Sequence, residues 1–96
     1  MVAEKYKQML LDIIKKYLPD AKVYLFGSRA KNYHDSGSDI DLALDAGTKI
    51  PIEALLDIAY DISESIIPYF VDVIDLKSVD QKFYESIEKD LILWNP

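Results

Sequence analysis

The 96-residue sequence predicts an α/β (α+β) fold, a small mixed β-sheet with helices packed on one face. Segments with helical spacing of apolar residues alternate with short runs of β-branched and aromatic residues. Half of the residues are apolar, so a chain of this length can bury a core of its own. The chain carries no repeat, linker or low-complexity segment, so residues 1–96 are expected to form a single domain.

The first half of the chain predicts one helix and one strand. Pro19 ends the helix, and residues 22–26 read as a strand that breaks at Gly27-Ser28. Residues 29–31 are expected to form a short helical turn, and residues 32–37 a polar loop. The helix is predicted from apolar side chains at the i, i+3, i+4, i+7 spacing: Tyr6, Met9, Leu10, Ile13, Ile14, Tyr17 and Leu18.

The second half predicts a strand, a helix, a second strand and a final helix. Residues 38–44 alternate in polarity as a strand does, and a helix is expected from Pro51 through residue 66. Residues 70–75 form the next predicted strand. Ser78 with Gln81 resembles a capping box that opens a helix through about residue 88, before a short extended end at 91–94. The aromatic residues Tyr69, Phe70 and Trp94 are expected in the core.

Composition and charge narrow the classes of function. The absence of cysteine excludes disulfides and thiolate metal sites, and the longest uncharged run, seven residues at 65–71, is too short to span a membrane. Residues 1–8 hold three charges and no apolar signal core, so a cytoplasmic protein is expected. The net charge of −6 argues against direct nucleic-acid binding.

The charge is also unevenly distributed. Residues 1–31 hold seven basic and three acidic side chains, whereas residues 32–96 hold four basic and fourteen acidic ones. The basic third reads either as the solvated face of a helix or as a patch for phosphates or an acidic partner. An acidic protein can still bind a phosphorylated ligand when metal cations lie between the two.

Three carboxylates are expected on one face of the sheet. Asp39 and Asp41 are two residues apart on a predicted strand, and their apolar neighbours point to the covered face. In the next strand Asp72 alternates with Val71 and Val73, which sends it to the same open face, whereas Asp75 shares the parity of the valines. Like charges this close weaken a sheet, and a divalent cation would relieve them. The alternative is a plain salt-bridge cluster in which Arg29 or Lys31 neutralises the aspartates.

Gly27-Ser28 lies between a strand and a possible helix start. Glycine permits close approach of the backbone to a ligand, and the amides and hydroxyl that follow favour an anion. On its own the pair is equally typical of an ordinary strand-to-helix turn in which serine is the N-cap.

The combined pattern is more specific than its parts. Gly27-Ser28, ten further residues, Asp39-Ile40-Asp41 and the later strand with Asp72 closely resemble the minimal nucleotidyltransferase (MNT) family of the DNA polymerase β superfamily. The resemblance implies the palm-like nucleotidyltransferase fold. It implies that Asp39, Asp41 and Asp72 are catalytic residues and ligands of two Mg²⁺ ions. It further implies that Gly27, Ser28 and Arg29 hold the triphosphate of ATP.

The same resemblance implies an acceptor and a partner. MNT proteins of this kind pair as antitoxins with a helical HEPN toxin, and the expected reaction is transfer of AMP from ATP to a tyrosine of that toxin. Two alternatives remain open at this point: a small-molecule nucleotidyltransferase subunit of the antibiotic-modifying type, and an antitoxin that binds nucleotide without turnover. The roles of His34 and Lys49 are not assigned by any pattern.

Overall fold

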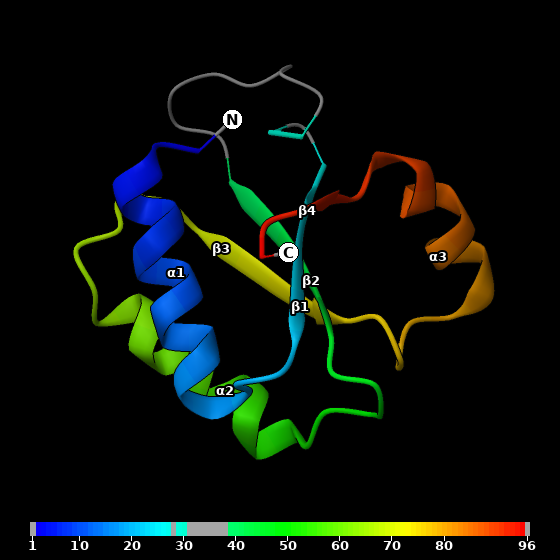
Figure 1. The fold of residues 1–96 in the computed structure, drawn as a ribbon, viewed down its shortest axis with the longest axis horizontal. Helices are drawn as coiled ribbons and strands as arrows, with labels where there is room; N and C mark the ends of the chain where they lie inside the picture. The colour runs from blue at the N-terminus through cyan, green and yellow to red at the C-terminus, as the bar shows by residue number, and fades with distance from the viewer. Residues whose placement is uncertain (1, 28, 31–38, 96) are drawn as a thin grey trace.

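The computed structural model describes residues 2–27, 29–30 and 39–95 of the chain. Within them the order is α1 (Glu4–Tyr17), β1 (Lys22–Phe26), β2 (Ile40–Asp45), α2 (Ile52–Ser63), β3 (Val71–Asp75), α3 (Gln81–Ile87), the 3-10 turn η1 (Glu88–Asp90) and β4 (Ile92–Leu93). The predicted order of helices and strands is confirmed, with one short strand added at the end (Figure 1).

The four strands form one mixed sheet in the order β3-β2-β1-β4. β1 pairs antiparallel with β2 and with β4, while β2 and β3 run parallel, joined by the crossover helix α2. The extended end predicted at residues 91–94 therefore becomes an edge strand. β3 lies at the opposite edge of the sheet.

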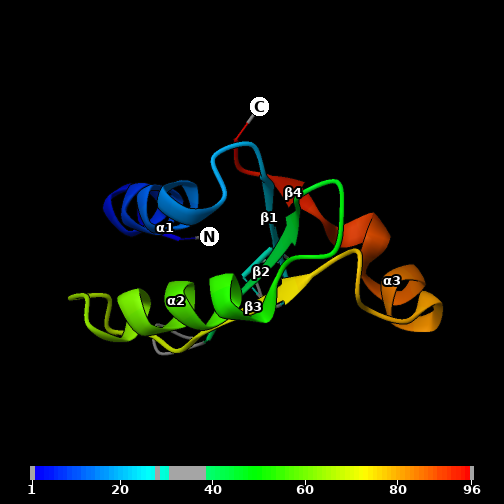
Figure 2. The ribbon, with the colours of Figure 1, turned by 90° about the horizontal axis from the view of Figure 1, so that it is seen from below.

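One face of the sheet is covered by α1 and α2, as predicted. The alternate residues Val23 and Leu25 of β1 and Ile40, Leu42 and Leu44 of β2 are fully buried there. α3 lies on the other side of the sheet (Figure 2). The ring of Phe83 meets Phe26, which alternates away from the covered face, edge-on at 6.5 Å. Helices therefore occur on both sides, but only α1 and α2 contribute to the main core.

Two helix boundaries differ from the prediction for local reasons. α2 ends at Ser63 rather than at residue 66, because the hydroxyls of Ser63 and Ser65 donate to the last-turn carbonyls of Tyr60 and Ile62. Pro51 is the N-cap of this helix, one position before the predicted first turn. The chain then turns through Ile66, which is 76% exposed.

The last helix begins from a different cap than predicted. Asp80 accepts a hydrogen bond from the Phe83 amide at 2.8 Å and is the N-cap of α3. Ser78 is not the cap, because its hydroxyl donates to Asp75 at 2.7 Å. Trp94 is buried as expected, but Phe70 is 82% exposed and is not part of the core. In the part of the chain that the structure describes, no helix is long and apolar enough to cross a membrane.

Buried Asp75 fastens the loop before α2 to the end of β3. Its carboxylate accepts hydrogen bonds from the amides of Ile50 (2.8 Å) and Lys77 (3.0 Å) and from the Ser78 hydroxyl. Burial alone raises the pKa of Asp75, but these hydrogen bonds outweigh it and hold the pKa below its ordinary value. Asp75 therefore has a structural role, at the end of β3 away from Asp72.

Candidate active site

Asp41 and Asp72 lie opposite each other on two neighbouring parallel strands. The register pairs Asp41 with Asp72 between β2 and β3, and the adjacent pair, Leu42 and Val73, points to the covered face. Paired residues of parallel strands project to the same face, about 5 Å apart at the backbone. Asp72 is exposed and Asp41 half-buried, so the facial argument that selected Asp72 over Asp75 holds in the structure.

Asp39 directly precedes β2 and is exposed. Burial, followed by the negative charges of Asp72 and Asp39, raises the pKa of Asp41 above its ordinary value. The negative charges of Asp39 and Asp72 thus both act on Asp41. Across the described ranges, no three His, Cys, Asp or Glu side chains converge tightly enough to hold a metal ion by themselves. That Asp39, Asp41 and Asp72 bind Mg²⁺ therefore stays a prediction. It rests on their place on the open face of the sheet and on the preference of Mg²⁺ for carboxylate oxygens.

Gly27 fits closely against Asp41. Its φ of +77° lies in the left-handed region, which side chains other than that of glycine rarely tolerate. A Cβ atom at this position would overlap Oδ2 of Asp41 and lie 3.2 Å from its Cγ. The missing side chain is therefore what lets the β1 end approach this carboxylate. Ser28, predicted together with Gly27, lies outside the described residues, as do His34 and Lys31.

Arg29 occupies a different environment from the one predicted. It is 4% exposed, and its guanidinium lies over the ring of Tyr69, 4.4 Å from the ring centroid. Tyr69 in turn meets Tyr6 of α1 edge-on at 5.8 Å. This stack ties the turn after Gly27 to α1 and to the segment before β3. A contact between Arg29 and phosphate stays a prediction, and it would need the side chain to leave this buried position.

Tyr69 is the residue near the site that the sequence patterns missed. It was expected only as a core aromatic, and nothing in the local sequence indicates that it faces Arg29, forty residues earlier. A cation over an aromatic face contributes about 0.5–2 kcal/mol, depending on how far the pair is desolvated.

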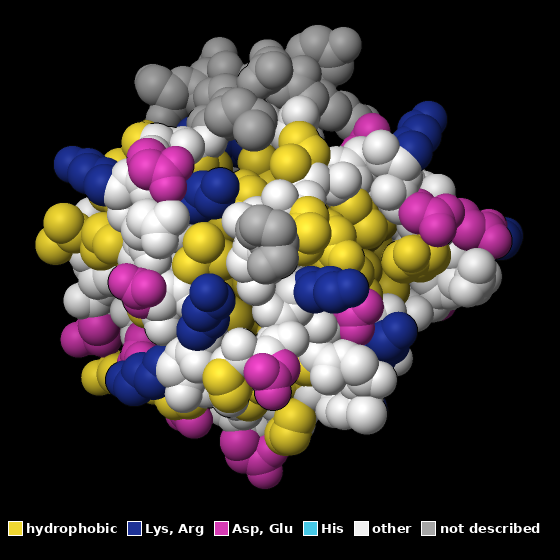
Figure 3. Space-filling view, in the orientation of Figure 1, with side chains coloured by type: hydrophobic (Ala, Val, Ile, Leu, Met, Phe, Trp, Pro, Cys, Tyr) yellow, Lys and Arg dark blue, Asp and Glu magenta, His cyan; other side chains and the backbone are white. Residues whose placement is uncertain are grey.

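Three lysines of the basic N-terminal third lie over aromatic rings in the described part of that segment. Lys5, Lys7 and Lys16 lie over the rings of Tyr6, Trp94 and Tyr17, and Lys16 also pairs with Asp61 at 3.2 Å. Figure 3 shows Lys and Arg side chains interspersed with Asp and Glu over the face that carries α1. Both interpretations of the basic third, a solvated helix face and a patch for phosphates or an acidic partner, stay predictions.

Solved structures share this fold over almost the whole chain. A crystal structure of a toxin–antitoxin with AMP-PNP matches with a TM-score of 0.78 at 22% identity, covering 94% of this chain and 73% of the matched chain. A tri-AMPylated HEPN toxin of Shewanella oneidensis in complex with MNT antitoxin matches with a TM-score of 0.73 at 20% identity, covering 97% and 72%. These likenesses establish the fold.

Sequence comparisons establish the family. The chain is 34% identical over 77 residues to the probable protein adenylyltransferase MntA of Haemophilus influenzae, covering 80% of this chain and 68% of the relative. The sequence model of the family described as polymerase beta, nucleotidyltransferase, matches residues 8–95, a range that contains every residue of the candidate site. The chain therefore belongs to the polymerase β nucleotidyltransferase family.

Proposed function

We propose that residues 1–96 act as one minimal nucleotidyltransferase domain that transfers AMP from ATP to a tyrosine of a HEPN-type toxin, and so serves as its antitoxin. The observation that carries the proposal is the pairing of Asp41 with Asp72, with Gly27 closely fitted against Asp41. Folding gains nothing from like charges in register on adjacent strands, one of them half-buried, so the arrangement points to a ligand. The names of the relatives support ATP as donor and a toxin as acceptor.

The donor set fits a divalent cation, because it consists of carboxylate oxygens, and the carboxylate of Asp41 lies closely against Gly27. Asp39, Asp41 and Asp72 would hold two Mg²⁺ ions. When bound, the ions supply charge stabilisation at the attacking and leaving oxygens of an in-line displacement. The glycine turn, with Ser28, would hold the triphosphate through its backbone amides.

The proposed reaction forms a bond between the tyrosine oxygen and the α-phosphorus of ATP. The bond from that phosphorus to the bridging oxygen of the β-phosphate breaks, and pyrophosphate leaves. Asp72 is the carboxylate proposed to accept the proton of the attacking hydroxyl, since it is the more exposed member of the pair. The cytoplasm, where ATP and Mg²⁺ are available, is the proposed location.

Position-specific labelling of ATP tests this proposal. The chain is incubated with Mg²⁺ and the HEPN protein encoded in its own genome, using ATP labelled at either the α- or the γ-phosphate. AMP transfer predicts protein-bound label only from the α-position, with the γ-label released in pyrophosphate. Protein-bound γ-label would indicate phosphoryl transfer, and absence of both labels from a bound HEPN protein would indicate an antitoxin that acts by binding alone.

Two glycines offer a matched test of the site geometry. Gly27→Ala places a side chain against Asp41 and should reduce AMP transfer strongly, by about 10²-fold or more, because the carboxylate must move. Gly47→Ala is the control, since its φ of +84° carries the same backbone strain but nothing lies within 4 Å of the added Cβ. Gly47→Ala should lose about 1–2 kcal/mol of stability through backbone strain, and Gly27→Ala should lose at least as much.

Initial rates of transfer and thermal melts of both variants separate the two effects. Equal losses of transfer in Gly27→Ala and Gly47→Ala would show that backbone strain, rather than the fit against Asp41, explains the defect.

A further inference from the structure

Large exposed apolar side chains concentrate in one stretch of this chain. Ile52, Leu56 and Tyr60 are 61–64% exposed and recur every four residues along α2, so they form one stripe. Ile66 and Phe70, at 76% and 82% exposed, follow α2 in the chain and are counted with the stripe, and Phe70 lines a hollow together with Ala59 and Ser63 of α2. Single exposed apolar residues are normal on a protein surface, but a contiguous set marks an interaction surface.

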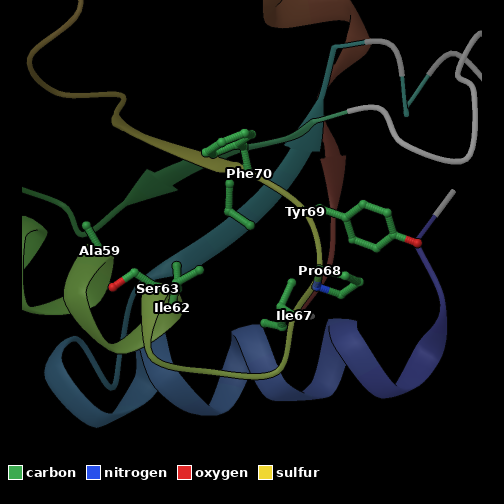
Figure 4. Close-up of a pocket in the computed structure, with 8 residues that line it drawn as sticks. Ala59, Ile62, Ser63, Ile67, Pro68, Tyr69 and Phe70 are labelled. Atoms are coloured by element: carbon green, nitrogen blue, oxygen red, sulfur yellow. The ribbon is translucent and has the colours of Figure 1, made fainter.

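The stripe borders two hollows between α2 and the edge strand β3. The first, about 430 Å³, is lined by Ala59 and Ser63 of α2, by residues 67–70 and by Val71 (Figure 4). The second, about 410 Å³, is lined by Ile52 and Leu55 on one side and by Val73 and Ile74 on the other. Stripe and hollows together are named the α2–β3 surface.

Exposed acidic side chains flank the apolar stripe, and one basic residue, Lys49, lines the second hollow. Residues 50–76 contain six acidic side chains and no Lys, Arg or His. Glu53, Asp57 and Glu64 are exposed beside the apolar stripe. A partner surface that matches it carries apolar side chains flanked by lysine or arginine. A second copy of this chain fits poorly, because a symmetric contact would bring the acidic residues of the two copies together.

The α2–β3 surface is continuous with the candidate active site. Phe70 lies two residues before Asp72, and its carbonyl accepts a hydrogen bond from the Ile40 amide, next to Asp39, at 2.9 Å. A protein seated on this surface is therefore held beside the carboxylates. Holding an acceptor hydroxyl there replaces a chance encounter with a local, effectively unimolecular reaction.

We infer that the protein carrying the acceptor tyrosine docks on the α2–β3 surface, through apolar side chains flanked by basic residues. The inference rests on the proposed function and names the surface by which this small chain recognises a protein acceptor. Docking and chemistry are then separate: the apolar stripe supplies affinity, and Asp39, Asp41 and Asp72 carry out the transfer.

Arginine substitutions on the stripe test the inference. Leu56→Arg and Ile66→Arg each replace an exposed apolar contact by a charge that repels a basic partner, so each should weaken binding to the HEPN protein of the same genome at least about tenfold and reduce its labelling in parallel. Leu93→Arg on β4, at the opposite edge of the sheet and 42% exposed, is the matched control and should bind as the wild type does.

The melting shift produced by Mg²⁺ with ATP monitors folding and the nucleotide site, and all three variants should retain it. Wild-type affinity in both stripe variants, or no binding of the HEPN protein by the wild type, would overturn the inference. If the stripe variants changed only the self-association of this chain, the inference would also be overturned, because the surface would then bind a second copy of the chain. A wild-type chain that binds the HEPN protein through this surface without labelling it would instead refute the proposed transfer and leave the docking inference standing.

Discussion

Asp41→Asn is expected to abolish AMP transfer, by a factor on the order of 10²–10³ or more, while leaving the fold intact. Asn is nearly isosteric but lacks the negative charge that would hold the cation, and through the cation the transferred phosphate. Because Asp41 faces Asp72 across the sheet and its pKa is raised by burial and by its acidic neighbours, the ionised pair opposes folding at neutral pH. Thermal stability of the metal-free variant should therefore equal or exceed that of the wild type.

The measurement pairs a transfer assay with thermal melts in the presence of a chelator. The gain in stability of Asp41→Asn over the wild type should fade as the pH falls towards the ordinary carboxyl range. There the wild-type Asp41 becomes protonated and no longer repels Asp72. An Asp41→Asn protein that melts well below the wild type at pH 7 would mean that the pair is structural.

Asp72→Ala and Asp75→Ala are expected to lose different properties, transfer activity in the first and folding stability in the second. Asp72→Ala should lose transfer with little change in stability, because Asp72 is exposed. Asp75→Ala removes a buried acceptor of three hydrogen bonds and should cost about 3 kcal/mol of folding free energy. At a temperature where it remains folded, Asp75→Ala should retain most of its transfer activity.

The pH dependence of stability provides a separate check on Asp75. Its folded-state pKa lies below the ordinary value near 3.9, so its carboxylate stabilises the fold above that value. This contribution disappears as the pH falls through the lower folded-state pKa. Urea unfolding between pH 7 and pH 2 should therefore show a smaller acid-induced loss for Asp75→Ala than for the wild type. If stably folded Asp75→Ala lost transfer while Asp72→Ala kept it, Asp75 and not Asp72 would be the third catalytic carboxylate.

The sequence was sufficient to predict three of the four strands and, once β2 and β3 are neighbours, the common face of Asp41 and Asp72. Side chains alternate strictly along a strand. The buried Ile40 and Leu42 and the partly buried Val73 therefore determine where Asp41 and Asp72 must point once the strands are neighbours. The family resemblance predicted the same residues independently.

Contacts between distant segments were beyond such patterns. Nothing local indicates that Arg29 packs on Tyr69. The cap of α3 was missed at short range instead, because Ser78 is engaged by Asp75, three residues earlier, and this leaves Asp80 as the cap. The exposure of Phe70 was missed because an aromatic residue before a strand usually packs inward, whereas here it extends the stripe from α2. The short strand β4 was missed as a paired element because only two residue pairs join it to β1.

Intact-mass analysis of the HEPN protein is the most direct test of the central claim, that the carboxylates of β2 and β3 transfer AMP to a protein tyrosine. After incubation with this chain, ATP and Mg²⁺, the HEPN protein should gain the mass of one or more adenylyl groups, and fragmentation should locate them on tyrosine. The gain should vanish with Asp41→Asn or without Mg²⁺. An unchanged mass in a stable complex with the wild-type chain, or a gain that persists with Asp41→Asn, would contradict the account.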